Sequence, residues 1–361
     1  MTPRADALTK LLGIRHPIVQ SGMSRVAGPD LVAAVSNAGG LGILAALRLQ
    51  PQDLRAQIRR IRELTALPFG VNLWLHPAVV SPNAVDSIDA GTLEGVQRQL
   101  NRIRARVGLA ESSAGPKPFP DLVAANFDVI VEERVPVWSI GLGNPSAEMV
   151  ARCHERGIRV MAMVTNVDDA RAVAARGVDV LVAQGTEAGG HRSNWSSAPP
   201  DEAATFVIVP KICDAVAQPV LAAGGIVDGR GLVAALALGA AGVMLGTRFI
   251  ATREAIAPDF FKQAVVAARP GDTEISRAFT GLPMRALRNA FTTAYGDAPV
   301  LPPMLQSSVT EDIFMAAASR ADARYAPMPA GESAGLIGDL PSAADVVRGI
   351  VEDADRIART L

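Results

Sequence analysis

Cysteine is scarce in this 361-residue chain, and its placement excludes several classes of protein. The two cysteines, Cys153 and Cys213, stand 60 positions apart, with no CxxC pair and no cluster of histidine and cysteine. This spacing supports neither a zinc site nor a disulfide framework. We therefore expect no bound metal and two reduced thiols within helices, as is usual for a cytoplasmic protein.

An excess of one charge is also lacking, because 35 basic side chains are balanced by 36 acidic ones. A nucleic-acid-binding protein usually has a basic excess, so we expect no nucleic-acid partner. No apolar run approaches the roughly 18 residues that span a bilayer, so we expect no membrane partner. The segment from Met1 to Lys10 lacks the apolar core of a secretory signal.

Hydrophobic residues are abundant, at 49 % of the chain, which is enough for a large core and argues against disorder. They recur as a short apolar run, a glycine or polar turn and an amphipathic helix. Helix starts are indicated at Asn144-Pro145-Ser146, at Asn166 or Asp168, and at Asp228. The pattern predicts eight strands: His16–Met23, Gly40–Ala45, Phe69–Leu75, Val135–Ile140, Arg159–Val164, Val178–Ala183, Pro219–Ala223 and Ala241–Leu245.

The predicted fold class is α/β, a TIM (β/α)8 barrel over residues 1–251. Most of the eight runs are apolar throughout, as expected for parallel strands covered on both sides. An open, doubly wound sheet is the structural alternative, but no GxGxxG fingerprint follows the first strand to support it.

Two regions break the strand–helix rhythm. In residues 77–120, polar residues and prolines flank one helical stretch, Thr92–Val107. This region is predicted to be an insertion after the third strand. From about Thr252 onward the strand pattern disappears. We expect residues 252–361 to form a helical cap packed on the barrel, ending in the amphipathic stretch Ser342–Thr360.

Two glycine-containing turns follow the last two predicted strands. Gly224 and Gly225 end the seventh, and Gly246 and Thr247 follow Met244 and Leu245 at the end of the eighth. Backbone without Cβ atoms can approach a ligand closely and direct N–H groups toward it. TIM barrels commonly bind phosphate at these two loops, so these residues are predicted to hold a phosphate-bearing cofactor. Close packing of helix on strand is the alternative reason for the glycines.

The segment Gln184–Arg192 directly follows the sixth predicted strand, at the catalytic end of the barrel. Gln184 can hydrogen-bond a flat heterocycle, and Gly189 and Gly190 allow the loop to lie against it. His191 is the histidine placed where proton transfer would be useful, so we predict a catalytic role. A structural role is the alternative. Among the other histidines, only His76, after the third strand, is placed where an approach to the site is conceivable, and no role is predicted for it.

Small and polar residues at two further strands are candidates for contact with the same cofactor. Gln20, Gly22 and Met23 end the first strand, and Asn72 lies in the third. Ordinary turn and core roles are the alternative for all four.

At these residues the sequence resembles the nitronate monooxygenase family, formerly called 2-nitropropane dioxygenases. The resemblance covers nearly the whole chain, in the segments HPIVQSGM, NAGGLGIL, PFGVNL, AQGTEAGGHRS, AAGGIVDGRGLVAALALGA, GVMLGTRF and GESAGLI. It implies a TIM barrel with FMN at its C-terminal mouth. By position it implies FMN contacts at Met23, Asn72, Gln184, Gly189, Gly224, Gly225, Gly246 and Thr247.

The resemblance also implies a reaction, in which an alkyl nitronate and O2 give a carbonyl compound and nitrite. One segment departs from the family pattern. Members of the family place a histidine after the fourth strand, in a segment like SFHFG, whereas here Ser139 is followed by Ile140 and Gly141. Ser139 and Gly141 are predicted to line the substrate site, with His191 as the remaining acid–base group.

Two other functions remain open. The turn Gly143-Asn144-Pro145-Ser146 resembles flavin-dependent enoyl-acyl carrier protein reductases, which use NAD(P)H and carry a histidine matching His191. Related NAD(P)H:quinone reductases have a similar Gly-Asn turn, so NAD(P)H is a possible reductant. A flavin-binding protein without turnover is the third alternative. The expected partners are a small-molecule substrate and O2, and the chain is expected to be a monomer or a homodimer.

Overall fold

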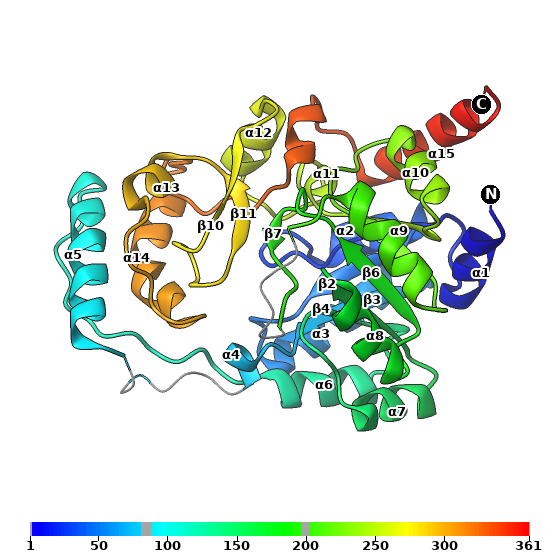
Figure 1. Cartoon of the computed structure of the whole chain (residues 1–361), viewed down its shortest axis with the longest axis horizontal. Coiled ribbons are helices and arrows are strands. Elements are labelled where there is room, and N and C mark those ends of the chain that lie inside the picture. Colours follow the sequence, from blue (N-terminus) through cyan, green and yellow to red (C-terminus); the bar gives the residue numbers. More distant parts are fainter. Residues whose placement is uncertain (1, 81–84, 86–87, 196–201, 361) are drawn as a thin grey trace.

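The computed structural model describes residues 2–80, 85, 88–195 and 202–360. Its centre is an eight-stranded parallel sheet in the order β1-β9-β8-β6-β5-β4-β3-β2 (Figure 1). All eight predicted strands are present. Their bounds are β1 (Ile18–Gln20), β2 (Gly42–Ala45), β3 (Phe69–Trp74), β4 (Val137–Leu142), β5 (Arg159–Val164), β6 (Val180–Gln184), β8 (Val220–Ala223) and β9 (Gly242–Leu245).

The sheet closes into a barrel between β1 and β2. Val19 bridges to Leu41, and Leu41 exchanges main-chain hydrogen bonds of 2.9 Å with the residues on either side of Val19. The side chain of Gln20 extends this pairing, since its amide oxygen accepts from Ile43 N at 3.1 Å and its amide nitrogen donates to Ile43 O at 3.2 Å. The buried side chain of Gln20 therefore adds hydrogen bonds between β1 and β2, where few main-chain hydrogen bonds join the strands.

Helices cover the outside of the barrel and return the chain to the start of each next strand. Three of the predicted starts are confirmed as N-caps, because Ser146, Asn166 and Asp228 each accept from a main-chain N–H in the first turn. These helices are α2 (Pro29–Asn37), α3 (Pro51–Leu64), α6 (Val123–Glu132), α7 (Ala147–Glu155), α8 (Val167–Ala175), α9 (Thr205–Ala215), α10 (Gly229–Ala237) and α11 (Thr247–Ile250). Within the described residues, none of the helices combines the length and apolar character of a membrane span.

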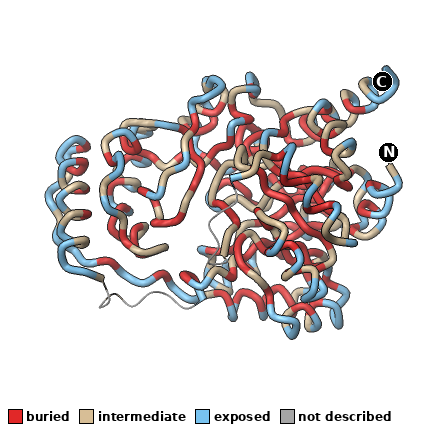
Figure 2. Tube along the Cα trace, in the orientation of Figure 1, coloured by how far each residue is buried: buried red, intermediate tan, exposed pale blue. Residues whose placement is uncertain are grey.

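The barrel interior is filled by side chains from alternate strand positions and is plugged at its N-terminal end. Helix α1 (Pro3–Leu12) supplies the plug, with Leu8 and Leu12 buried against Val19, Met161 and other interior residues. A larger apolar cluster lies between the strands and the outer helices. Buried residues accordingly concentrate in the barrel (Figure 2). The open end for a ligand is the C-terminal one.

The predicted insertion and the C-terminal segment pack together into a lobe with its own apolar core. Helix α5 (Ala90–Arg106) of the insertion packs against α13 (Ala290–Tyr295) and α14 (Leu305–Ser319). Figure 1 shows these three helices beside one another, away from the barrel. Val96, Leu100 and Ile103 of α5 are fully buried there. Three further short helices of these regions are α4 (Pro77–Val80), α12 (Asp259–Ala267) and the 3-10 helix η2 (Glu332–Leu336).

The C-terminal segment is mostly helical, as expected, but it also contains strands that the sequence did not predict. Strands β10 (Thr273–Ser276) and β11 (Met284–Leu287) form an antiparallel pair, and β11 also pairs with β7 (Gly190–His191). The four-residue strands are too short to give a clear alternating pattern. After the lobe, α15 (Ala343–Ala358) returns to pack on α10 and α2 of the barrel.

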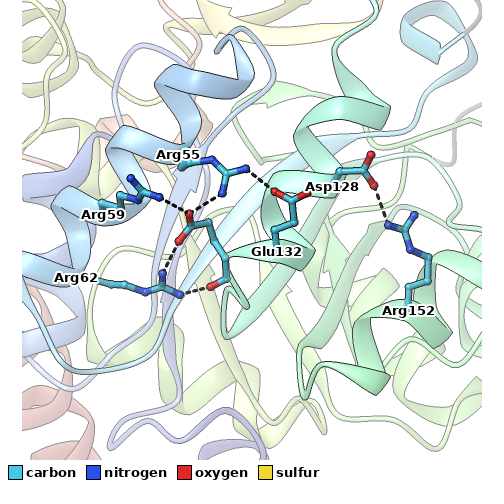
Figure 3. Close-up of polar contacts among 7 residues, drawn as sticks. Arg55, Arg59, Arg62, Asp128, Glu132 and Arg152 are labelled. Carbon is cyan, nitrogen blue, oxygen red and sulfur yellow. Dashed lines mark hydrogen bonds and ion pairs between the residues drawn. The ribbon is translucent and has the colours of Figure 1, made fainter.

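A network of ion pairs joins the outer helices α3 and α6 (Figure 3). Arg55 and Arg62 of α3 each contact a carboxylate oxygen of Glu133 at 2.8 Å, and Arg59 contacts it at 3.4 Å. Glu133 follows the last residue of α6, and its side chain is 11 % exposed. Although burial alone would raise the pKa of Glu133, the hydrogen bond from Arg55 and the charges of Arg59 and Arg62 lower it.

Candidate active site

The two predicted glycine turns lie on adjacent strands at the C-terminal mouth of the barrel, since β8 pairs with β9. Gly224 and Gly225 both have positive φ angles, +111° and +72°, in the left-handed region that favours glycine. Among the described residues, no acceptor is found for the main-chain N–H groups of Gly225, Gly246 and Thr247. Unpaired N–H groups in open turns form a cradle that can bind an anion.

The loop after β6 is held in one conformation by the residue that precedes it. The amide nitrogen of Gln184 donates to His191 O at 2.9 Å, and its amide oxygen accepts from Ser193 N at 2.9 Å. The guanidinium of Arg192 donates to Gly185 O at 2.5 Å. Gln184 is buried and its amide is engaged within the protein, so the structure gives it a loop-shaping role. Its contact with a cofactor stays a prediction.

The C-terminal lobe holds the same loop from outside. Gly189 lies so close to the lobe that a Cβ atom there would be 2.4 Å from Gly331 N. Gly331 N donates to the hydroxyl of Thr247 at 2.9 Å, which connects the lobe to the second glycine turn. Buried Arg285 of β11 donates to Thr186 O at 2.8 Å and pairs with Glu332 at 3.1 Å. The loop, the lobe and the end of β9 therefore form one connected rim.

A carboxylate stands beside the first glycine turn. Both oxygens of Glu187 accept from Thr205 N at the start of α9, at 3.0 and 2.9 Å. The hydroxyl of Thr205 has acceptors at 3.0 Å in Glu187 and in Gly224 O. The carboxylate is thus hydrogen-bonded to the first main-chain N–H of a helix, which has no acceptor within the helix. It fixes the turn around Gly224 from the side.

His191 lies in β7, where the barrel meets the lobe. Its Nε2 atom is 2.9 Å from the hydroxyl of Thr280, and its ring meets that of Trp74 edge-on, with centroids 4.8 Å apart. Burial, then the positive charge of Arg48, then His76, lower the pKa of His191 to about 3. The imidazole is therefore neutral at physiological pH, which argues against the predicted proton transfer by His191 near neutral pH. A neutral hydrogen-bonding role is compatible with this environment.

The predicted substrate-binding residues of β4 lie next to β3 in the barrel mouth. The amide nitrogen of Asn72 donates to the hydroxyl of Ser139 at 3.0 Å. At Gly141 a Cβ atom would be 2.8 Å from Trp74 Nε1 and 3.0 Å from the Asn72 amide oxygen. The structure therefore brings Asn72, Ser139, Gly141 and His191 together around the indole of Trp74.

The remaining predicted contacts differ in what they can offer a ligand. Gly22 is crowded, because a Cβ atom there would be 2.5 Å from Asn72 Cβ. Met23 is partly buried and borders Gly246, where a Cβ atom would lie 3.5 Å from the methionine sulfur. Leu245 packs with the apolar cluster outside the barrel, whereas Met244 belongs to the interior cluster. Only the main chain of Leu245 is therefore available at the mouth.

The sequence prediction missed four residues of this rim: Trp74, Glu187, Thr280 and Arg285. Glu187 lies inside the quoted segment AQGTEAGGHRS, but an acid beside a predicted phosphate site gave no reason to select it. Trp74 is the second-last residue of the third predicted strand, where an apolar residue is expected in any case. Thr280 and Arg285 belong to the lobe and follow His191 in the chain by about ninety residues. Sequence spacing alone does not predict that they lie near it.

Together these features define an α/β-barrel enzyme whose mouth combines an anion cradle with neutral hydrogen-bonding groups. Residues 5–353 match the model of a protein family described as nitronate monooxygenase. The chain belongs to this family, and is an oxidoreductase.

Individual relatives agree with this assignment. The chain is 34 % identical to a probable nitronate monooxygenase of Staphylococcus aureus (strain MSSA476), over 98 % of both proteins. Among solved structures it is similar to nitroalkane oxidase from Streptomyces ansochromogenes, with a TM-score of 0.87, 34 % identity and coverage of 98 % and 99 % of the two chains. It is also similar to FabK from Thermotoga maritima, with a TM-score of 0.77, 32 % identity and coverage of 98 % and 97 %.

Proposed function

We propose that the chain binds FMN at the barrel mouth and oxidises alkyl nitronates with O2, giving carbonyl compounds and nitrite. The observation that carries the proposal is the pair of glycine turns at the same mouth as His191 and its neutral surroundings. The family match and the likeness to a nitroalkane oxidase support the same reaction.

The residues at the glycine turns fit the phosphate of FMN. The N–H groups of Gly225, Gly246 and Thr247 have no acceptor among the described residues, and the glycines at both turns carry no side chain that would cover the main chain. Asn72, Met23 and the Gly189–Gly190 segment are the proposed neighbours of the ring system. Bound FMN would supply the electron-accepting ring and the site of reoxidation by O2.

The protein's own part in this reaction is to bind and orient an anion without exchanging a proton. A nitronate is already deprotonated, so the reaction does not need a general base with a pKa near 7. His191 is neutral, and its position is set by Thr280 and Trp74. The positive charge of Arg48, which lowers the pKa of His191, also favours an anionic substrate at this mouth.

An NAD(P)H-dependent flavin reductase acting on enoyl-acyl carrier protein or a quinone is the second candidate. Two observations favour it, the similarity to FabK and the turn Gly143-Asn144, in which the amide oxygen of Asn144 is buried without a hydrogen-bond partner among the described residues. An orphaned acceptor beside the mouth suits an amide donor on a ligand. A flavin-binding protein without turnover is the candidate of another class.

Anaerobic reduction of the purified FMN-loaded protein distinguishes the three candidates. One cuvette receives ethylnitronate and another receives NADPH or NADH, and flavin absorbance is followed in both. We expect bleaching by the nitronate and release of nitrite when air is admitted. Bleaching by NADPH or NADH but not by ethylnitronate would establish the reductase instead. No bleaching in either cuvette would favour the non-catalytic alternative.

A further inference from the structure

The indole of Trp74 is placed at the centre of the candidate site by an irregularity in the barrel. Trp74 is the last residue of β3, and the register of β3 against β4 shifts between Leu73 and Trp74. Such a shift re-aims the side chain that follows it, and these irregularities recur next to active sites. Trp74 is only partly buried: its ring packs against the larger apolar cluster and meets the ring of His191 at the mouth.

Gly141 is the reason that the indole fits. A Cβ atom at this position would lie 2.8 Å from Trp74 Nε1 and 3.0 Å from Trp74 Cδ1, closer than real Cβ atoms come to their neighbours. The nitrogen-bearing edge of the ring therefore occupies the space where a side chain of residue 141 would begin. On its other side the ring is held by His191, edge-on at 76°.

The indole N–H has no protein acceptor among the described residues, although polar groups surround it. The amide nitrogen of Asn72 donates to the hydroxyl of Ser139, and Nε2 of His191 is hydrogen-bonded to the hydroxyl of Thr280. An indole nitrogen is a donor only, and its proton does not titrate in the biological pH range. Trp74 thus presents a fixed, neutral donor in the mouth.

We infer that the N–H of Trp74 donates a hydrogen bond to an oxygen of an anionic N–O substrate, and that Gly141 lacks a side chain to make room for it. This inference rests on the proposed function, because it assigns a substrate-binding residue to the same site. A hydrogen bond to a charged oxygen is worth more than one to a neutral oxygen. Trp74 therefore selects the anionic nitronate over the neutral nitroalkane.

The chain has three tryptophans, so its indole N–H groups can be followed individually by nitrogen-15 NMR of tryptophan-labelled, FMN-loaded protein. Nitrite, which carries the same N–O oxygens, and ethylnitronate under anaerobic conditions are the probes. We expect the Trp74 signal to move downfield with increasing probe while that of Trp138 stays. Trp138 is the reference because it is fully buried on the helix side of β4. An unmoved Trp74 signal with both probes overturns the inference.

Two variants give a second measurement. Trp74→Phe removes the N–H and keeps an aromatic ring, and we expect the anaerobic dissociation constant of ethylnitronate to rise about ten-fold or more while that of neutral nitroethane changes little. Gly141→Ala should give the same selective loss by displacing the indole, and Trp138→Phe should give none. Equal effects on the anionic and neutral substrates would overturn the inference.

This experiment separates the inference from the proposed function. Nitrite shifts the Trp74 signal without any turnover, so that result stands even where the protein releases no nitrite from a nitronate. Turnover of nitronate by Trp74→Phe with the dissociation constant of the unmodified protein would retain the proposed function and remove Trp74 from it.

Discussion

His191 illustrates at the residue scale how surroundings decide the chemistry of a side chain. The loop position of His191 and its flanking glycines indicate a ligand-facing residue, and the structure places it at the barrel mouth. Burial and the nearby charge of Arg48 hold its pKa at about 3, far below the ordinary value. At physiological pH its imidazole is therefore neutral in this structure, and its catalytic role stays a prediction.

The low pKa of His191 has a consequence for stability. Above about pH 6.5 the imidazole is neutral in both the folded and the unfolded chain, and the folded state loses nothing. Between about pH 6.5 and pH 3, His191 is protonated in the unfolded chain but not in the folded chain. The free energy of unfolding therefore falls as the pH is lowered. We expect His191→Gln to flatten this slope.

Denaturant unfolding at a series of pH values measures the effect. His154→Gln is the matched control, since His154 lies in α7 on the outside of the barrel and pairs with Asp179. Parallel slopes for His191→Gln and the unmodified protein would show that His191 is accessible to protons in the fold.

At the scale of elements, the barrel helices follow sequence rules, but their mutual attachment depends on contacts between distant residues. The cap residues Ser146, Asn166 and Asp228 act within one turn, so the sequence predicts them well. By contrast, the arginines of α3 are more than seventy positions from Glu133, and no spacing rule connects them.

Glu133 is expected to fasten α6 to α3. Glu133→Gln removes the charge that the arginines share, and we expect a loss of about 1–2 kcal/mol of unfolding free energy at pH 7. Because the pKa of Glu133 is lowered in the fold, this stabilisation is present above the ordinary glutamate pKa. It disappears as the pH falls through the lowered value, so the two proteins should converge in acid.

Thermal and denaturant unfolding at pH 7 and in acid test this. Glu63→Gln is the control, because Glu63 forms an ion pair with Arg60 on the surface and both side chains are more than half exposed. A deficit for Glu133→Gln that persists unchanged in acid would assign its cause to packing rather than charge.

At the scale of the whole molecule, the lobe and the barrel meet at glycines that admit no side chain. A Cβ atom at Gly189 would clash with the main chain at Ala330 and Gly331. We expect Gly189→Ala to cost about 1–3 kcal/mol and to separate the lobe from the loop after β6. The hydrogen bonds from Gly331 N to Thr247 and from Glu332 N to Glu187 O should be lost with it.

Hydrogen exchange at the amides of Gly331 and Glu332 reports the separation directly. Gly349→Ala is the matched substitution in α15, where a Cβ atom meets nothing within 4 Å, and it should stabilise the helix by up to about 1 kcal/mol. Exchange at Gly331 that is equally slow in Gly189→Ala and Gly349→Ala would contradict the close contact.

By itself the sequence determined the eight barrel strands, the outer helices that begin after Ser146, Asn166 and Asp228, and the position of both glycine turns. These are local properties, since apolar runs, caps and glycine signals act within a few residues. The resemblance to a family added the cofactor and reaction that we propose. The sequence did not predict the short strands β10 and β11, because four residues show no clear alternation of apolar and polar side chains.

Only the tertiary structure decided how the insertion and the C-terminal segment combine into one lobe, and which side chains that lobe brings to the barrel mouth. The pKa of His191 and the place of the Trp74 indole over Gly141 both follow from groups that meet through packing. Burial and contact between residues far apart in the chain are properties of the packed molecule, and they set the charge and the free hydrogen-bond donors of this site.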